Sequence, residues 1–275
     1  MLKCGITGSK GNLGKNFIKI NLKKFEFIKF KGDISKKKEI SDWVKNSKFE
    51  ILIHFAAFVP TVKVNNNYKK AVKTNFYGTK YLVDAIIDYK KNIKWAFFSS
   101  TSHVYPLQKK LIKESFKAKP VTKYGKTKFL AENYFRKKLY KANINYCVGR
   151  IFSIFDNQGS EFFTPSLIKK IKQKSKLLIL DNLNHYRDFL STEQISKIIY
   201  FLWKKKFVGT INIGSGVNTN LKFIAKVFAK KLKKRVKFID NKPTYHLADI
   251  SKLKKLGYKK SRLNFIRFFN QIKFK

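Results

Sequence analysis

The sequence has 275 residues, 44% of them hydrophobic, and a formal net charge of +46 from 62 Lys and Arg against 16 Asp and Glu. The length supports one large domain or a core domain with a smaller lobe, and the lack of a membrane-length apolar run or a signal-peptide stretch predicts a cytoplasmic protein with no membrane attachment. Lysines are spread between apolar residues in nearly every block of ten, which is typical of a solvated surface, so we expect no specific nucleic-acid partner and keep a nucleic-acid-binding surface as the alternative.

The first 155 residues alternate between short apolar runs and amphipathic segments. The segment 51–57 is a continuous apolar run of the kind that is buried on both faces of a sheet. The segment 68–89 has Val72, Phe76, Val83 and Ile86 near helical spacing, so these side chains are expected to point inward. In chain order we expect strands at 2–8, 25–30, 51–57, 93–100 and 144–152, and helices at 11–24, 35–46, 68–89 and 124–140. This alternation predicts an α/β fold, a Rossmann-type doubly wound parallel sheet.

The pattern changes after about residue 155. The segment 156–165, "DNQGSEFFTP", is typical of a loop, and a helix with Pro165 in its first turn follows it. A helix at 193–205 and a strand at 209–215 are expected to rejoin the sheet, and a strand at 235–240 with two or three helices makes up the rest. We therefore expect a Rossmann domain of residues 1–153, joined by 184–215, and a smaller C-terminal lobe of residues 154–183 and 216–275.

The two cysteines, Cys4 and Cys147, lie in separate apolar runs without CxxC or metal-ligand spacing. This placement predicts two buried thiols and argues against a disulfide or a metal site.

Three glycines separate the first predicted strand from the first predicted helix, in "ITGSKGNLG". Glycine suits a tight turn, the close approach of a phosphate and the close packing of a helix on a strand. The amides at the start of the helix attract a pyrophosphate, so the turn predicts a dinucleotide site, with a purely structural turn as the alternative. The expected cofactor contacts are Gly8, Lys10, Gly11, Asn12, Leu13 and Gly14.

Further blocks follow in a fixed order along almost the whole chain. They are "GDI" at 32–34, "HFAA" at 54–57, "TNFYGTKYLVDA" from 74, "FFSSTSHVYP" from 97, "YGKTKFLAE" from 124, "GRIFSIF" from 149, "RDFLS" from 187 and "INIGSG" from 211. With the glycine turn, they resemble the extended short-chain dehydrogenase/reductases, the NAD(P)-dependent epimerase/dehydratase family that modifies nucleotide sugars.

The resemblance implies a catalytic set of Thr101, Tyr124 and Lys128. In the family, the Tyr of Tyr-x-x-x-Lys donates or accepts the proton, and the Lys lowers the pKa of the phenol, about 10 when free, and contacts the nicotinamide ribose. A Ser or Thr hydrogen-bonds the reacting sugar oxygen, and Thr101 matches it best, with Ser100 second.

The same resemblance implies further cofactor contacts at Asp33, Ile34, Ala56, Ala57 and Asn75. Asn75 is expected to act mainly as support for the active-site strand. We read the histidine at position 54 as a hydrogen-bonded structural residue. The lysines at positions 29 and 31 give a slight preference for NADP(H) over NAD, and ordinary surface charge is an equally good explanation.

On the substrate side, the resemblance implies that Arg187 contacts the diphosphate of a nucleotide-diphosphate sugar, with an ion pair to Asp188 or another carboxylate as the alternative. Ser153 stands where the family has Asn. The loop at 156–165 is expected to form part of the substrate wall. Dehydratases of the family carry Asp-Glu directly after the Thr, whereas this chain has Ser102 and His103, which disfavours dehydration.

The sequence thus predicts an NAD(P)-dependent nucleotide-sugar oxidoreductase, either a 4-ketoreductase or an epimerase. Its family resemblance also implies a possible homodimer. The alternative is a non-catalytic nucleotide-binding or RNA-binding protein on the same scaffold, for which the positive charge would be the reason.

Overall fold

The computed structural model describes residues 1–275 apart from 90, 157–162, 176, 260–262, 264 and 266–275. Two compact units make up the chain. The first unit contains Met1–Pro106, Phe116–Ile151 and Thr192–Ile213, and the second contains Leu107–Ser115, Phe152–Ser191 and Gly214–Lys275. Each unit is therefore assembled from three separate segments.

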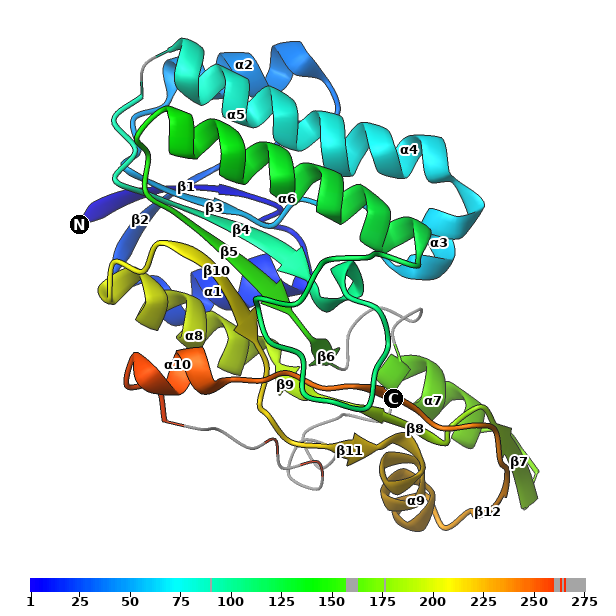
Figure 1. The fold of residues 1–275 in the computed structure, drawn as a ribbon. Helices are drawn as coiled ribbons and strands as arrows, with labels where there is room; N and C mark the ends of the chain where they lie inside the picture. The colour runs from blue at the N-terminus through cyan, green and yellow to red at the C-terminus, as the bar shows by residue number, and fades with distance from the viewer. Residues whose placement is uncertain (90, 157–162, 176, 260–262, 264, 266–275) are drawn as a thin grey trace. The chain divides into compact units, whose positions relative to one another are not determined.

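A six-stranded parallel sheet forms the centre of the first unit (Figure 1). Its strands are β1 (Leu2–Thr7), β2 (Phe25–Lys29), β3 (Ile51–His54), β4 (Trp95–Thr101), β5 (Tyr146–Ile151) and β10 (Gly209–Ile213), in the order β10-β5-β4-β3-β1-β2. The order reverses between β1 and β3, so the sheet is doubly wound, as predicted. The carboxyl ends of these two strands form the switch point where such sheets bind ligands.

Helices cover both faces of this sheet (Figure 1). They are α1 (Asn12–Asn21), α2 (Lys37–Asn46), α3 (Thr61–Asn66), α4 (Tyr68–Val72), α5 (Gly78–Asp88), α6 (Lys123–Lys141) and α8 (Thr192–Lys204), with a short 3₁₀ turn η2 (Ser102–Val104). Helix α1 packs against α8 on one face, and α2, α5 and α6 lie together on the other. The apolar stripes of α2, α5 and α6 meet the sheet in one core that includes Val83, Ile86 and Phe98.

The predicted continuous helix over 68–89 is instead interrupted by a π-helical turn, η1 (Lys73–Tyr77), between α4 and α5. Val83 and Ile86 point into the core as expected, but Phe76 is only half-buried and Val72 lines an open hollow. A π turn adds a residue to the helical repeat and so changes which residues face inward. Because of that change, the polar side chain of Asn75 is fully buried.

The second unit has short strands and its own apolar core. Its strands are β6 (Ser153–Phe155), β7 (Leu177–Asp181), β8 (His185–Arg187), β9 (Phe189–Ser191), β11 (Thr219–Asn220), β12 (Arg235–Ile239) and β13 (Thr244–His246), and its helices are α7 (Phe163–Ile171), α9 (Leu221–Lys231) and α10 (Ser251–Lys255). Strand β8 lies between β11 and β13, while β7 pairs with β12 and β6 with β9. Phe155, Phe189 and Phe228 meet in the core between these elements. Residues 157–162 of the predicted substrate-wall loop lie outside the described residues.

Cys4 on β1 and Cys147 on β5 are not joined in a disulfide, and neither has exposed surface. Within the described part of the chain, no helix has the length and hydrophobicity to cross a membrane, and no group of His, Cys, Asp and Glu could hold a metal ion.

Candidate active site

The glycine turn joins β1 to α1 at the switch point of the sheet. Gly8 has a φ of +71°, and a Cβ there would lie 2.6 Å from the backbone nitrogen of Ala56. A Cβ on Gly14 would lie 2.2 Å from the carbonyl oxygen of Gly8, so helix and turn are in direct contact. By contrast, a Cβ on the exposed Gly11 would meet only that same oxygen, at 3.4 Å. Gly11 is the N-cap of α1 and no side chain caps it, which leaves room for a phosphate before the first helical amides.

A buried histidine holds together the strands below this turn. His54 at the end of β3 hydrogen-bonds Thr7 through Nδ1 (2.6 Å) and Thr79 on α5 through Nε2 (2.9 Å). Burial lowers the pKa of His54 to about 3, so the imidazole is neutral. Thr7 also accepts a hydrogen bond from the amide of Ala56, which fixes the half-buried Ala56 and Ala57 beside the glycine turn. His54 is therefore a structural residue, in agreement with the sequence analysis.

Asn75 connects the segment after β3 to α6. Its side-chain oxygen accepts from the amide of Phe58 (2.6 Å), and its nitrogen donates to the carbonyl of Phe58 (3.3 Å) and to the hydroxyl of Thr127 (2.9 Å). Thr127 directly precedes Lys128 in the chain. These bonds support the two segments that carry the cofactor-side and catalytic candidates.

Thr101, Tyr124 and Lys128 come together in the first unit. Thr101 ends β4, while Tyr124 and Lys128 lie one turn apart on α6. Helix α6 starts here because the hydroxyl of Thr122 caps the amide of Gly125 at 2.9 Å. A Cβ on Gly125 would lie 2.2 Å from the carbonyl of His103, so glycine brings the helix against the turn that follows β4. Tyr124 is thereby placed close enough to Thr101 for that hydroxyl to act on the pKa of its phenol.

Burial changes the pKa values of both Tyr124 and Lys128. Burial raises the pKa of the Tyr124 phenol to about 12, and the hydrogen bond from Thr101 opposes that rise. Burial lowers the pKa of the Lys128 ammonium to about 7, and the negative charge of Glu132 opposes that fall. Lys128 is 1% exposed, with its ammonium 4.2 Å from the ring centroid of Phe98. The phenol is therefore protonated at neutral pH in the protein alone, and the amine titrates near neutrality.

The residues expected at the adenosine end follow β2 directly. Asp33 is exposed, and its carboxylate accepts from the amide of Ser35 at 2.9 Å. Ile34 is buried against Gly78 at the start of α5. Lys29 and Lys31 are both exposed at the end of β2.

The two predicted substrate residues, Arg187 and Ser153, belong to the second unit. The guanidinium of Arg187 donates to the carbonyl of Tyr186 (2.8 Å) and to the carbonyl and hydroxyl of Thr244 (3.1 and 3.0 Å). The alternative ion pair between Arg187 and Asp188 does not occur in the structure. The carboxylate of Asp188 is instead occupied by three amides and a hydroxyl, from Ser215, Gly216 and Ala248.

Sequence reasoning missed a buried charged cluster beside the catalytic candidates. Glu132 on α6 and Arg150 on β5 form an ion pair with side chains 1% and 9% exposed. Glu132 also accepts from Ser100 on β4 at 2.5 Å, and Arg150 donates to the hydroxyl of Tyr105 at 2.6 Å. One sequence signal was available: an arginine inside the apolar run "INYCVGRIF" requires a buried partner, and Glu132 lies on the same helical face as Lys128.

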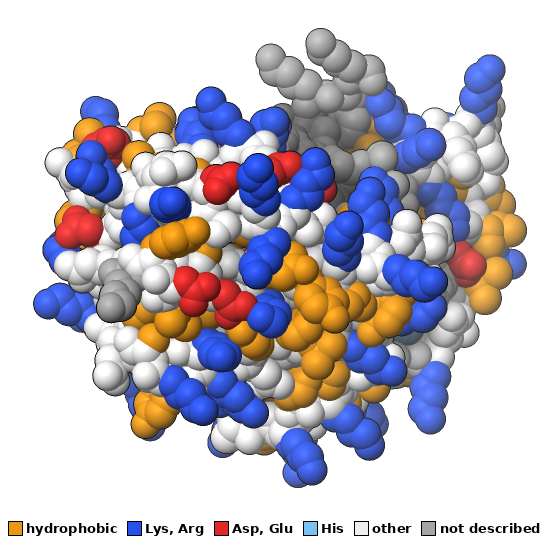
Figure 2. Space-filling model, turned by 90° about the horizontal axis from the view of Figure 1, so that it is seen from above, with side chains coloured by type: hydrophobic (Ala, Val, Ile, Leu, Met, Phe, Trp, Pro, Cys, Tyr) orange, Lys and Arg blue, Asp and Glu red, His pale blue; other side chains and the backbone are white. Residues whose placement is uncertain are grey.

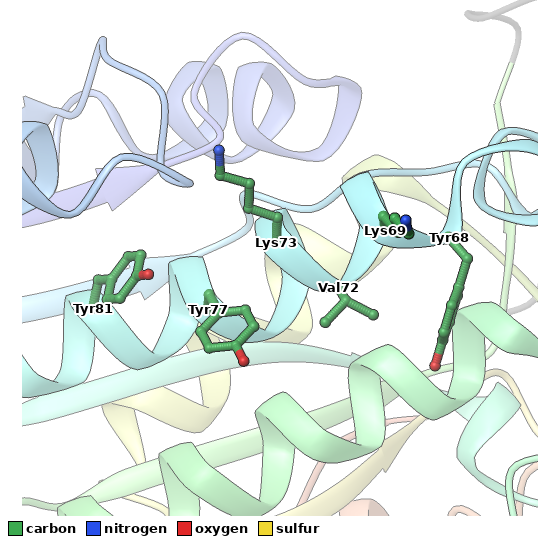
Figure 3. A pocket seen from close by; sticks show the side chains of 6 residues that line it. All are labelled: Tyr68, Lys69, Val72, Lys73, Tyr77 and Tyr81. Carbon is green, nitrogen blue, oxygen red and sulfur yellow. The ribbon is translucent and has the colours of Figure 1, made fainter.

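A separate open hollow of about 410 Å³ lies along α4, η1 and α5 of the first unit (Figure 3). It is lined by Tyr68, Lys69, Val72, Lys73, Tyr77 and Tyr81. Tyr68 extends toward α6, where Lys123 lies over its ring, whereas Lys73 extends the opposite way (Figure 3). Neither the glycine turn nor the Thr101–Tyr124–Lys128 group lines it.

Comparison with known proteins identifies the family. Residues 6–214 match the model of the NAD dependent epimerase/dehydratase family. The chain belongs to this family, that of the extended short-chain dehydrogenase/reductases. Family members are NAD-dependent enzymes that act on nucleotide sugars, in agreement with the predicted enzyme class.

Individual relatives span several reactions of the epimerase/dehydratase family. GDP-6-deoxy-D-talose 4-dehydrogenase of Aggregatibacter actinomycetemcomitans is 31% identical over 227 residues, which cover 78% of this chain and 75% of the relative. UDP-glucose 4-epimerase of Mycoplasma genitalium is 25% identical over 242 residues, covering 78% and 70%. In fold, the structure of RMD from Pseudomonas aeruginosa complexed with NADPH matches with a TM-score of 0.87 at 17% identity, over 98% of this chain and 97% of that one.

Proposed function

We propose that the protein transfers hydride at a carbon of a nucleotide sugar, and that its activity is that of a 4-ketoreductase. The observation that carries this proposal is the group of Thr101, Tyr124 and Lys128 at the carboxyl end of β4, where the hydroxyl of Thr101 is close enough to Tyr124 to act on the pKa of its phenol. The residues after Thr101 are Ser102 and His103, which do not offer the carboxylate pair that water elimination needs.

The ionisation of the group favours the reducing direction. Reduction of a ketone needs a proton donor, and the pKa of Tyr124, raised to about 12, keeps its phenol protonated. Thr101 donates to the ketone oxygen, and the charge of Lys128 stabilises the phenolate left after proton transfer. Oxidation would need the phenol to lose its proton first. The relative that acts as a 4-dehydrogenase adds support for chemistry at this carbon.

The glycine turn fits a dinucleotide cofactor, which supplies or accepts the hydride when bound. A Cβ on Gly11 would meet only one atom, and no side chain caps the start of α1. Both features leave space for a pyrophosphate. We propose Gly8, Lys10, Asn12, Leu13 and Gly14 as the other contacts of the turn. Asp33, Ile34, Ala56 and Ala57 would line the nucleoside side, with Asn75 as support and Tyr124 and Lys128 at the nicotinamide end.

Between the two cofactors, we propose a preference for NADPH. Lys29 and Lys31 are exposed where β2 ends, at the strand position that meets the adenosine ribose in doubly wound folds. Two ammonium groups there would attract a 2′-phosphate.

For the substrate side, we propose that the second unit is the substrate-binding lobe. Arg187 is the first candidate for the diphosphate, because its donors contact only carbonyl and hydroxyl oxygens and its charge has no carboxylate partner among the described residues. Ser153, half-buried at the start of β6, is the second substrate candidate.

Epimerisation is the second candidate function, favoured by the relative that is a UDP-glucose 4-epimerase. The two reactions differ in cofactor balance. A reductase consumes NADPH in proportion to the sugar converted, whereas an epimerase interconverts two sugars with no net consumption.

The experiment is a panel of nucleotide-linked 4-keto sugars with NADH and NADPH, run on wild type, Tyr124→Phe and Tyr140→Phe. Tyr140 is the matched control, since it lies on the same helix and is 74% exposed. Tyr124→Phe should lower kcat by about 10²–10⁴-fold, the usual contribution of a general acid, while cofactor binding followed by fluorescence is retained. Tyr140→Phe should match wild type. Wild-type turnover by Tyr124→Phe would overturn the proposed role of Tyr124, and RNA binding without any cofactor binding would favour the non-catalytic alternative.

We further propose a homodimer formed through the outer faces of α5 and α6. Figure 2 shows hydrophobic side chains gathered among lysines on the side of the first unit that carries these helices. Leu130 on α6 is 46% exposed there, and Tyr77, the last residue of η1 directly before α5, is 43% exposed. Exposed apolar side chains on neighbouring helices are suited to a helix-to-helix interface.

A further inference from the structure

Four side chains of the first unit form a buried polar chain next to the catalytic candidates. Arg150 donates to Glu132 from Nε to Oε2 (3.3 Å) and from Nη2 to Oε1 (2.5 Å), a bidentate contact. Its third nitrogen, Nη1, donates to Tyr105, whose hydroxyl in turn donates to Asn212 on β10 at 3.0 Å. The carboxylate of Glu132 is thus held by Arg150 on β5. Arg150 is held in turn by Tyr105, which is itself hydrogen-bonded to Asn212 on β10.

This carboxylate contacts the neighbour of one catalytic candidate and lies one turn from another. Ser100, which directly precedes Thr101 on β4, donates to Glu132 at 2.5 Å. On α6, Glu132 follows Lys128 by four residues, so both project from one face of the helix. Glu132 therefore ties the end of β4 to the helix that carries Tyr124 and Lys128.

The charges around Lys128 give the carboxylate a second effect. Within the described residues, no side chain accepts a hydrogen bond from the ammonium, and Phe98, whose ring centroid lies 4.2 Å from it, is neutral. His54 of β3 faces it but is uncharged, because burial lowers the pKa of His54 to about 3. Tyr124 is neutral as well. Glu132 is thus the negative charge that favours the protonated form of this lysine, and it is itself balanced by Arg150.

We propose that Glu132 is a positioning residue for the reaction: held by Arg150, it keeps Lys128 charged and, through Ser100, holds Thr101 against Tyr124. This inference rests on the proposed function, because it assigns a purpose to the environment of the same three residues. It makes two separable claims, one about charge and one about position.

The test of the charge claim is Glu132→Gln, which keeps the size of the side chain and removes its charge. Without the carboxylate the pKa of Lys128 falls, so the high-pH limb of kcat/KM for ketone reduction should move to lower pH, by about one unit for an interaction of about 1.4 kcal/mol. The pH dependence of NADPH binding, followed by fluorescence, should move in the same direction, which gives a readout independent of turnover. Glu132→Asp retains the charge and should restore the wild-type limb.

The test of the position claim is Ser100→Ala, which cuts the bond to β4 and leaves the charge of Glu132. It should lower kcat about 10-fold, the equivalent of one lost hydrogen bond to a charged group, with the limb unmoved. Glu193→Gln is the matched control, because Glu193 on α8 pairs with Lys197 four residues away but is 59% exposed. It should change neither quantity.

The outcomes separate this inference from the proposed function. The charge claim is overturned if the high-pH limb of kcat/KM stays at its wild-type position in Glu132→Gln. It is also overturned if the limb moves as far in Glu132→Asp as it does in Glu132→Gln. Full activity in Ser100→Ala overturns the position claim. Wild-type activity in Tyr124→Phe would instead remove the proposed function itself. Since Glu132→Gln leaves the charge of Arg150 buried, a failure to fold is answered by the double variant Glu132→Gln/Arg150→Met. In that variant the high-pH limb should move in the same direction but less far, because the guanidinium that repels the Lys128 ammonium is lost as well.

Discussion

Buried polar residues in the first unit differ in charge according to what surrounds them. His54 sits between two threonine hydroxyls and is neutral, whereas Glu132 and Arg150 are both charged and neutralise each other. The residue types were readable from the sequence, and His54 was read correctly as structural. The contact between Glu132 and Arg150 was not read, because it joins a helix to a strand 18 residues away and no local pattern records it.

At this scale we predict how His54 affects stability with pH. Its pKa is about 3 in the folded protein and 6.5 when unperturbed, so between these values the unfolded chain binds the extra proton. Stability contributed by the neutral imidazole is therefore complete above pH 6.5 and falls as the pH decreases, by up to about 1.4 kcal/mol per unit. Urea unfolding of wild type and His54→Gln across this range measures the difference, and parallel slopes in the two proteins would contradict it.

Among the elements, long periodic segments were predicted well and short or irregular ones were not. The strands of the central sheet were predicted from apolar runs, which is sufficient where a strand is buried on both faces. Strands such as β11, with two residues, are too short to show a period. The π turn η1 was missed because a single added residue leaves the apolar pattern on either side intact. This added residue nevertheless determines that Asn75 faces inward.

The turn between β1 and α1 leads to a paired prediction. Alanine at position 14 would place its Cβ 2.2 Å from a backbone oxygen, so Gly14→Ala should lower the free energy of unfolding by about 1–3 kcal/mol. Gly11→Ala meets only one atom, at 3.4 Å, and should leave stability within about 1 kcal/mol of wild type while weakening cofactor binding about 10-fold or more. Urea unfolding and a fluorescence titration of NADPH measure the two effects. If instead Gly11→Ala lost stability and Gly14→Ala weakened cofactor binding, the pyrophosphate would not lie beside Gly11.

Across the whole molecule, the dominant feature is charge. The chain carries +46, and lysines are distributed over the face in Figure 2 among the hydrophobic side chains instead of forming one separate patch. This distribution fits a solvated surface, and family membership explains the chain better than the nucleic-acid alternative does. The sequence predicted the sheet as a whole from its alternating elements. It did not predict that residues 107–115 belong to the second unit, where they pair with residues 245–249, because that pairing joins distant segments.

The charge also sets the conditions for the proposed dimer. Two copies with +46 each repel, and salt screens that repulsion over about 10 Å at 0.1 M. Sedimentation velocity should therefore detect more dimer at about 0.3 M NaCl than at about 20 mM. Leu130→Glu should abolish association at both, whereas Leu107→Glu, at a leucine of the second unit with a similar exposure of 48%, should not. Association that weakens with salt would point to a polar contact in place of the helical face.

The buried thiols of Cys4 on β1 and Cys147 on β5 can be used to measure how often the central sheet opens. An alkylating reagent cannot reach either thiol in the folded first unit, since both have no exposed surface. Labelling requires the strands to separate, so its rate measures the opening of the central sheet. It does not report on the second unit, which contains no cysteine. Adding NADPH to such a measurement would show directly how much a bound dinucleotide slows those openings.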